Sequence, residues 1–93
     1  MEFDWDEAKR LGNIEKHSID FLRAMLIFEG RVFTRRSDQG GEERSIAVGK
    51  VDGRVIAVVY TDRTHEGAIR RRLISARGAR TDEKENYRKI AGK

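Results

Sequence analysis

Apolar residues recur with helical spacing in the first third of the chain and with strand spacing in the rest. A first amphipathic stretch follows Asp6, a residue that favours helix starts, and runs to about Lys16. A second follows Asp20, places apolar residues at i, i+3, i+4 and i+7, and stops at Gly30. The pattern predicts two helices before the sheet, and residues 3–5 ahead of them form either a short strand or an extended lead-in.

Strand-like patterns occupy most of the chain after Gly30. Residues 55–61 are almost wholly β-branched, aromatic or small and apolar, which is typical of a strand buried on both faces. An Asp-Gly pair at positions 52 and 53 predicts a tight hairpin, residues 62–67 supply a second turn, and residues 37–41 form a turn or a mobile loop. The predicted strands cover residues 31–36, 44–51, 55–61 and 69–77.

The last predicted element is a third helix. Gly78 ends the sheet, and Thr81 caps a helix whose first turn carries Asp82 and Glu83, where acidic side chains oppose the helix dipole. Short turns between consecutive strands favour a largely antiparallel meander with the helices on one face. We therefore expect an α+β fold with two N-terminal helices, a four-stranded sheet and one C-terminal helix, in a single domain over residues 1–93.

The charge distribution adds a candidate function to this fold. The 93 residues carry 20 Lys and Arg against 16 Asp and Glu, which gives a net charge of +4. Six arginines lie between Arg63 and Arg80, against the two acids Asp62 and Glu66. Arginine favours planar, bidentate recognition of phosphate. The cluster is therefore a surface for nucleic acid, a surface for an acidic protein, or a solvated structural face.

Several kinds of protein are excluded by what the sequence lacks. The chain has no cysteine, which excludes disulfides and thiolate metal sites and fits a reducing compartment. No apolar run approaches about 18 residues and the N-terminus is acidic, so we expect no membrane span, no signal peptide and a cytoplasmic location. No metal-ligand spacing, phosphate-binding loop or nucleophile elbow is present, so neither a metal nor a cofactor is expected.

The arginines of the last strand supply the first candidate site. Arg77 and Arg80 flank the turn into the last helix, where an anion could bind. Alternatively, Arg77 pairs with Asp82 or Glu83. Simple alternation predicts that one face of this strand carries Arg71, Leu73, Ser75 and Arg77.

The remaining candidates are less specific. His17, at the end of the first helix, is either a structural cap or a general acid–base group, and His65 has no recognisable partner spacing. Trp5 is interpreted as a core anchor, whereas Tyr87 fits packing as well as a stacking or phosphate-contacting role. The residues alone therefore indicate a small basic domain with an arginine-rich sheet rim, and they indicate no reaction.

Several short motifs, spaced in order along nearly the whole chain, form one recognisable pattern. They are Phe3 to Lys9, Asn13 to Phe21, Glu43-Arg44 with Gly49, Gly53-Arg54-Val55, Val58 to Arg63, Arg72 to Ala79, Glu83 and Tyr87. Together these motifs resemble one family, the BrnT-type toxins of type II toxin–antitoxin systems. Ser18 stands where that family usually has glycine after the histidine, so this turn lacks the residue that most easily adopts a left-handed conformation. Asp62 stands where glutamate is common.

The resemblance implies a RelE-like fold and a metal-independent endoribonuclease that inhibits translation. It also implies a BrnA-like antitoxin, a DNA-binding protein through which the pair would reach operator DNA, and a hetero-oligomer of toxin and antitoxin. RNA is the implied substrate. Such cleavage uses the 2′-OH as the nucleophile on the adjacent phosphate, and it needs a base, cations for the developing charge and a proton for the leaving oxygen.

These requirements assign roles to individual residues. Arg63 and Arg77 are assigned to transition-state stabilisation, because arginine is permanently charged. His17 is the acid–base candidate, and Glu43 is an alternative base. The alternative function is a non-catalytic module that binds an antitoxin, a nucleic acid or both, and RNA cleavage in EDTA would discriminate the two. The predicted substrate-binding residues are Arg80, Lys16, Arg72 and Tyr87.

Overall fold

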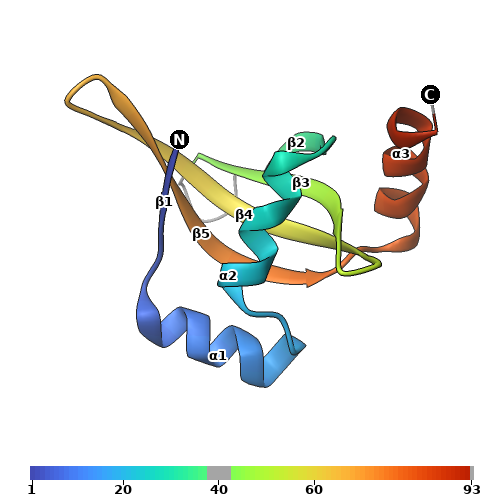
Figure 1. Ribbon diagram of the computed structural model, residues 1–93, viewed down its shortest axis with the longest axis horizontal. Coiled ribbons are helices and arrows are strands. Elements are labelled where there is room, and N and C mark those ends of the chain that lie inside the picture. The colour runs from blue at the N-terminus through green and yellow to red at the C-terminus, as the bar shows by residue number, and fades with distance from the viewer. Residues whose placement is uncertain (38–42, 93) are drawn as a thin grey trace.

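The computed structural model describes residues 1–37 and 43–92 (Figure 1). Most of the predicted turn over residues 37–41 lies outside them. Among the described residues, no helix is long and apolar enough to cross a membrane. The elements are β1 (Glu2–Asp4), α1 (Glu7–His17), α2 (Phe21–Ala24), the 3₁₀-helix η1 (Met25–Glu29), β2 (Phe33–Ser37), β3 (Arg44–Val51), β4 (Arg54–His65), β5 (Ala68–Gly78) and α3 (Thr81–Ala91).

The strands form one sheet in the order β1-β5-β4-β3-β2, in which only the pair β1 and β5 is parallel. The prediction of four largely antiparallel strands is therefore wrong, because the sheet is five-stranded and mixed. The sequence left β1 undecided because it has three residues, two of which, Glu2 and Asp4, are charged. Their carboxylates pair with Arg70 and Arg72 of β5, so these charges belong to the edge of the sheet.

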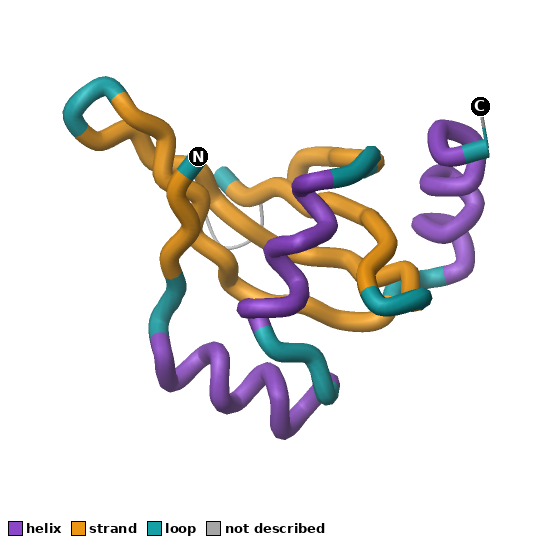
Figure 2. Tube along the Cα trace, viewed as in Figure 1, coloured by secondary structure: helices purple, strands orange, loops and turns teal. Residues whose placement is uncertain are grey.

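Helices cover both faces of the sheet, so the predicted placement of all helices on one face is also wrong. α2 and η1 lie across one face, named here the α2 face, and α1 lies beside them against β5 (Figures 1 and 2). The second predicted helix is thus α-helical only as far as Ala24 and continues as 3₁₀-helix. On the opposite face, named the α3 face, Tyr87 of α3 packs against the buried cluster of Ile46, Val48 and Ala57.

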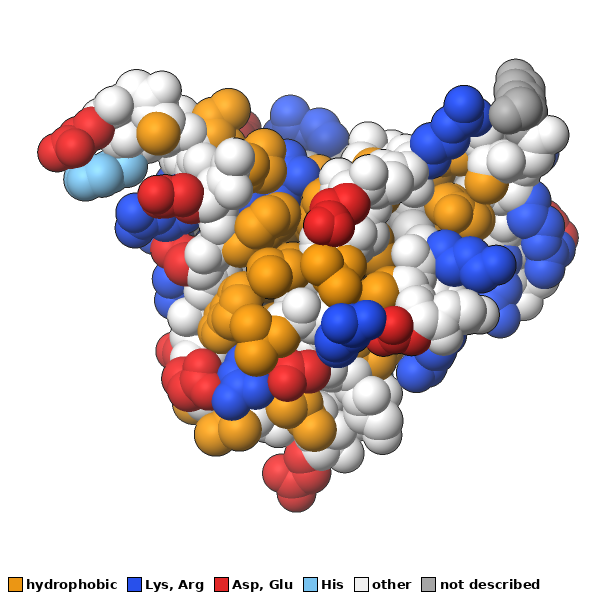
Figure 3. All heavy atoms as spheres, in the orientation of Figure 1, with side chains coloured by type: hydrophobic (Ala, Val, Ile, Leu, Met, Phe, Trp, Pro, Cys, Tyr) orange, Lys and Arg blue, Asp and Glu red, His pale blue; other side chains and the backbone are white. Residues whose placement is uncertain are grey.

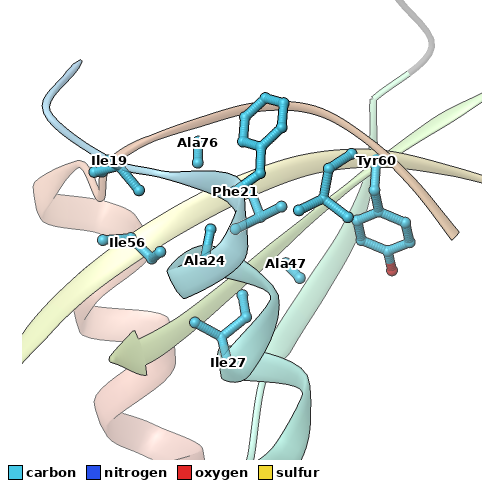
Figure 4. Close-up of a cluster of buried hydrophobic side chains, with 10 residues drawn as sticks. Ile19, Phe21, Ala24, Ile27, Ala47, Ile56, Tyr60 and Ala76 are labelled. Atoms are coloured by element: carbon cyan, nitrogen blue, oxygen red, sulfur yellow. The ribbon is translucent and has the colours of Figure 1, made fainter. Parts of the chain in front are cut away.

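The larger apolar cluster lies between the sheet and α2 (Figure 4). η1 approaches β3 closely at Gly49, where an added Cβ would lie 2.7 Å from the Cβ of Ile27. Only glycine therefore allows this contact without displacement of the helix. The buried members of the cluster are Ile19, Phe21, Ala24, Ile27, Ala47, Ile56, Val58, Tyr60, Leu73 and Ala76.

α1 takes the place of a neighbouring strand along the second half of β5. β1 pairs only with residues 70–72 of β5, which leaves later backbone groups of that edge without a strand partner. Asn13 satisfies those of Ala76, because its side chain donates to the carbonyl oxygen of Ala76 at 2.9 Å and accepts from the Ala76 N–H at 3.0 Å. The same amide also donates to the carbonyl oxygen of Ile19. A buried asparagine, 6% exposed, thereby fixes α1 to the sheet.

A bulge in β5 corrects the predicted faces of that strand. Ile74 has no partner on β4, and this extra residue reverses the alternation that follows it. Simple alternation placed Arg71 and Arg77 on the same face, but Arg71 lies on the α2 face, over the rings of Phe28 and Tyr60, whereas Arg77 lies on the α3 face. The pairs on either side of the bulge are Val59 with Ser75 and Tyr60 with Leu73.

The hairpin of β4 and β5 extends beyond its neighbours as an arm, defined here as residues 62–69 (Figure 1). The turn at its tip is shorter than predicted, because only Glu66 and Gly67 adopt the positive φ values, 50° and 80°, of a two-residue turn. The predicted hairpin at Asp52 and Gly53 is confirmed, with φ values of 53° and 75°.

Candidate functional site

The α3 face of the sheet carries a pocket of about 290 Å³, named here the arginine pocket. β2, β3, β4 and β5 each point alternate side chains to this face, and the bulge brings the end of β5 into line with the others. Four guanidinium groups and two hydroxyl groups surround the pocket, with two apolar side chains between them. Its lining residues are Arg35, Ser37, Arg44, Ile46, Val59, Ser75, Arg77 and Arg80.

The carboxylate of Glu83 holds two of these arginines in place. The Glu83 side chain is 1% exposed and lies in the first turn of α3. It accepts hydrogen bonds from Nη1 and Nη2 of Arg77 at 2.8 and 3.0 Å, and from Nη2 of Arg35 at 3.3 Å. The backbone N–H of Arg80 donates a fourth, at 2.8 Å. A buried anion thus fixes the orientation of two guanidinium groups at one side of the pocket.

The charges of this network are fixed at neutral pH. Hydrogen bonds from Arg77 are the main reason why the pKa of Glu83 falls from its usual 4.5 to about 2. The same bonds raise the pKa of Arg77. The described residues that line the arginine pocket include no histidine, acid or lysine, so they supply positive charge but no group of a type that titrates near neutral pH.

Arg77 keeps one edge of its guanidinium group available. Its two Nη1 hydrogens are accounted for by Glu83 and the carbonyl oxygen of Gly78, and Nη2 uses one hydrogen on Glu83. The Nε–H and the second Nη2–H have no partner among the described residues. This Nε–Nη2 edge is a fork that matches two oxygens of a carboxylate or phosphate, and Arg71 uses the same edge to hold Asp62.

Comparison with known families shows which kind of protein carries this pocket. A family model described as the ribonuclease toxin BrnT of type II toxin–antitoxin systems matches residues 5–83. The chain belongs to this family. Membership confirms the resemblance read from the motifs and implies a protein antitoxin as the partner. A search of curated proteins finds no match.

Two residues predicted for the site of this BrnT-family chain line the arginine pocket. Arg77 pairs with Glu83, as one of the two sequence hypotheses expected, and it also borders the pocket. Arg80 precedes α3, has an exposed side chain and makes no ion pair within the described residues. Tyr87 is placed differently, because it packs into the apolar cluster beneath α3.

Arg63 and Arg72 lie on the same face of the sheet as Arg77 but toward the arm. Ala57, the β4 residue paired with Arg77, is six positions before Arg63, which separates the two arginines by roughly 20 Å along the strand. Arg63 therefore lies well away from Arg77 along the sheet, and it does not line the arginine pocket. Arg72 pairs with Asp4 at 3.4 Å.

The proton-transfer candidates lie outside the arginine pocket. Glu43 precedes β3 with its side chain 88% exposed, pairs with Arg36 at 3.4 Å, and lines an adjoining hollow that shares Arg44 with the pocket. His17 and Lys16 belong to α1 and do not line the pocket. Among residues 1–37 and 43–92, no group of three or more His, Cys, Asp or Glu side chains is placed to hold a metal ion.

Sequence reasoning missed four polar lining residues, Arg35, Ser37, Arg44 and Ser75. Arg35 and Arg44 lie on strands that were predicted, but their meeting with Arg77 depends on the order of the strands in the sheet. Ser75 was assigned to the face of Arg77 correctly, although by an alternation that ignored the bulge. The sequence feature that indicated this network was Glu83, an acid three residues after Arg80 whose side chain could reach back to the turn before α3.

Proposed function

We propose that the arginine pocket is where this toxin binds and cleaves RNA, without a metal ion. The observation that supports this best is the Nε–Nη2 edge of Arg77, which Glu83 holds in a fixed orientation while leaving it without a partner among the described residues. A phosphodiester presents two non-bridging oxygens that match this fork. The guanidinium groups of Arg35, Arg44 and Arg80 surround the same space.

The proposed reaction is an attack of the RNA 2′-OH on the adjacent phosphorus atom. The bond to the 5′-oxygen breaks, and the products carry a 2′,3′-cyclic phosphate and a 5′-hydroxyl. The intermediate phosphorane carries more negative charge than the substrate, so fixed guanidinium groups bind it more tightly than the ground state. Each donor of this kind contributes about 10²- to 10³-fold to the rate in comparable oxyanion sites.

We propose Glu43 as the base that accepts the proton of the 2′-OH. It is an exposed carboxylate one residue before Arg44, and the hollow that it lines adjoins the arginine pocket. His17, the other sequence candidate, belongs to α1 and does not line the arginine pocket. Arg63 and Arg72 are proposed to contact the substrate at a distance from the scissile phosphate.

The consequence for the cell follows from the same proposal. Cleavage of RNA in the cytoplasm would stop translation, and a BrnA-like antitoxin would neutralise the toxin within a hetero-oligomer. The toxin would then reach operator DNA only through that antitoxin. The family model supports this proposal to the extent of a ribonuclease toxin with a protein antitoxin.

Cleavage of a defined RNA in the presence of EDTA tests the proposal. The wild type should cut the RNA and leave a 2′,3′-cyclic phosphate, whereas Arg80→Gln should cut at least about 100-fold more slowly. Lys9→Gln is the matched control, because it removes one positive charge from an exposed position on α1. Loss of activity in EDTA, or equal rates for Arg80→Gln and Lys9→Gln, would contradict the proposal.

One observation favours the second candidate function, a binding module without catalysis. The described residues that line the arginine pocket include none of a type that titrates near neutral pH, so they offer charge stabilisation but no proton transfer. If the wild type binds RNA and leaves it uncut, while Glu43→Gln binds equally well, the module without catalysis is correct.

A further inference from the structure

A second group of cations lies on the other side of the turn that joins β5 to α3. Arg54, Lys84 and Arg88 line an open hollow of about 480 Å³, named here the α3 hollow, together with Gly53, Val55, Gly78 and Ala79. Figure 3 shows Lys and Arg side chains gathered in the region of α3. The α3 hollow shares no lining residue with the arginine pocket.

The three cations of the α3 hollow are unusual because no carboxylate of the described residues pairs with them. Within residues 1–37 and 43–92, the side chains of Arg54, Lys84 and Arg88 make no ion pair. Most other arginines of the sheet and helices do so, for example Arg10, Arg23, Arg70, Arg71, Arg72 and Arg77. Three like charges around one hollow repel each other, and an anion bound between them removes that repulsion.

The guanidinium group of Arg54 lies against the end of β5. A Cβ built at position 78 would be 2.8 Å from its Nη2 atom. Lys84 and Arg88 are one helical turn apart on α3 and reach the α3 hollow from the same side of that helix. The strand end and the helix thus contribute separate cations to one site.

The α3 hollow lies next to the arginine pocket along the chain. Arg77 borders the pocket and Gly78, its neighbour, borders the hollow. Arg80 borders the pocket and Lys84 borders the hollow, and the two residues are one helical turn apart, a rise of about 6 Å. A nucleic-acid strand that leaves the pocket across the β5–α3 turn therefore meets the α3 hollow with one of its next phosphates.

We infer that the α3 hollow binds the backbone phosphates of the same RNA strand whose scissile phosphate occupies the arginine pocket, an inference that rests on the proposed function. A phosphodiester backbone fits an open, cationic surface, because proteins bind single-stranded nucleic acid in positively charged grooves that follow its backbone. The site adds affinity for RNA of any sequence, since phosphate contacts carry no base information.

The experiment compares two double variants in RNA binding. Arg54→Gln with Lys84→Gln removes two charges from the α3 hollow, and Lys9→Gln with Lys89→Gln removes two exposed charges that do not line it. Lys84 and Lys89 share one helix, so this pair of lysines is closely matched. The probe is a labelled 2′-O-methyl RNA of about twelve nucleotides, which cannot be cleaved, and the readout is fluorescence anisotropy over a range of salt concentrations.

We expect the hollow variant to bind this RNA about tenfold more weakly and to lower the slope of log K against log salt by about 1.4, or about 0.7 per lost phosphate contact. The Lys9/Lys89 variant should stay within about twofold of the wild type. Equal weakening in the two variants, or an unchanged salt slope in the hollow variant, would overturn the inference.

Two further readouts separate this inference from its alternatives. The hollow variant should bind the antitoxin and double-stranded DNA as the wild type does. If it loses binding to one of these ligands while RNA binding stays intact, the α3 hollow is a site for that ligand and the inference is overturned. Because the probe cannot be cut, failure of the proposed function appears independently, as a wild type that leaves natural RNA intact. In that case weaker binding by the hollow variant would still support the phosphate site.

Discussion

Replacing Glu83 with glutamine should destabilise the protein strongly at neutral pH and much less in acid. The carboxylate is 1% exposed and accepts four hydrogen bonds, from Arg77, Arg35 and the backbone of Arg80. Its pKa of about 2 in the folded protein lies about 2.5 units below its usual 4.5. At about 1.36 kcal/mol per unit, ionisation of Glu83 contributes on the order of 3 kcal/mol to folding at neutral pH.

The sign of the pH dependence follows from the lowered pKa. A carboxyl group with a depressed pKa contributes its full stability above the unfolded value of 4.5, and this contribution is lost as the pH falls toward about 2. Wild-type protein should therefore lose about 2 kcal/mol between pH 7 and pH 3 through this group alone. The Glu83→Gln variant has no such group, so its stability should approach that of the wild type in acid.

Urea unfolding of both proteins at pH 7 and pH 3 measures this difference. We expect a gap of about 3 kcal/mol at pH 7 that shrinks to about 1 kcal/mol at pH 3. Asp82→Asn is the matched control, because Asp82 is an exposed acid in the same turn of α3, and it should change stability by less than about 0.5 kcal/mol. An equal gap at the two pH values would refute the role of the Glu83 charge.

Three further predictions, made with four substitutions, test the fold and the arm. Asn13→Ala leaves Ala76 and Ile19 without their side-chain partner and should cost about 2–4 kcal/mol in urea unfolding; a cost below about 0.5 kcal/mol would show that water replaces the amide. Gly49→Ala should destabilise by about 1–3 kcal/mol, whereas Gly12→Ala, in open space on α1, should stabilise by up to about 1 kcal/mol; equal effects would contradict the close approach of η1. Arg63→Gln should raise KM several-fold for long RNA and leave cleavage of a dinucleotide unchanged, and an equal effect on both substrates would place Arg63 at the scissile phosphate.

Local signals in the sequence predicted much of the secondary structure. The apolar run before Tyr60 is β4, the Asp-Gly pair forms the expected turn, and Asp6 and Asp20 accept backbone hydrogen bonds at the starts of α1 and α2. Each of these features depends on a few neighbouring residues. Short-range chemistry of this kind is readable without knowledge of the tertiary fold.

Local sequence patterns could not predict the features that depend on residues far apart in the sequence. β1 is a strand because Glu2 and Asp4 find arginines on β5, almost seventy residues later. The bulge at Ile74 follows from how β5 pairs with β4, and it decides that Arg77 faces α3 rather than α2. The parallel edge strand and the two-sided placement of helices come from these long-range pairings.

The candidate site was predicted in part for the same reason. Arg77 and Arg80 were identifiable because they flank a turn, which is a local feature. Arg35 and Arg44 join them only through the strand order, and Arg63 is separated from them only through the register of β4 and β5. The charge distribution left a nucleic-acid surface, an acidic-protein surface and a solvated face open, and the strand order decides which arginines lie together.

Single-turnover cleavage of RNA by the Arg77→Lys variant tests the central claim most directly. Lysine keeps a positive charge beside Glu83 but lacks the Nε–Nη2 fork, so the fold should persist while the transition state loses its bidentate partner. The account predicts a rate at least about 100-fold below that of the wild type, with a melting temperature within a few degrees and RNA binding reduced only modestly. A variant that cleaves RNA at the wild-type rate would show that the arginine pocket is not where the phosphate reacts.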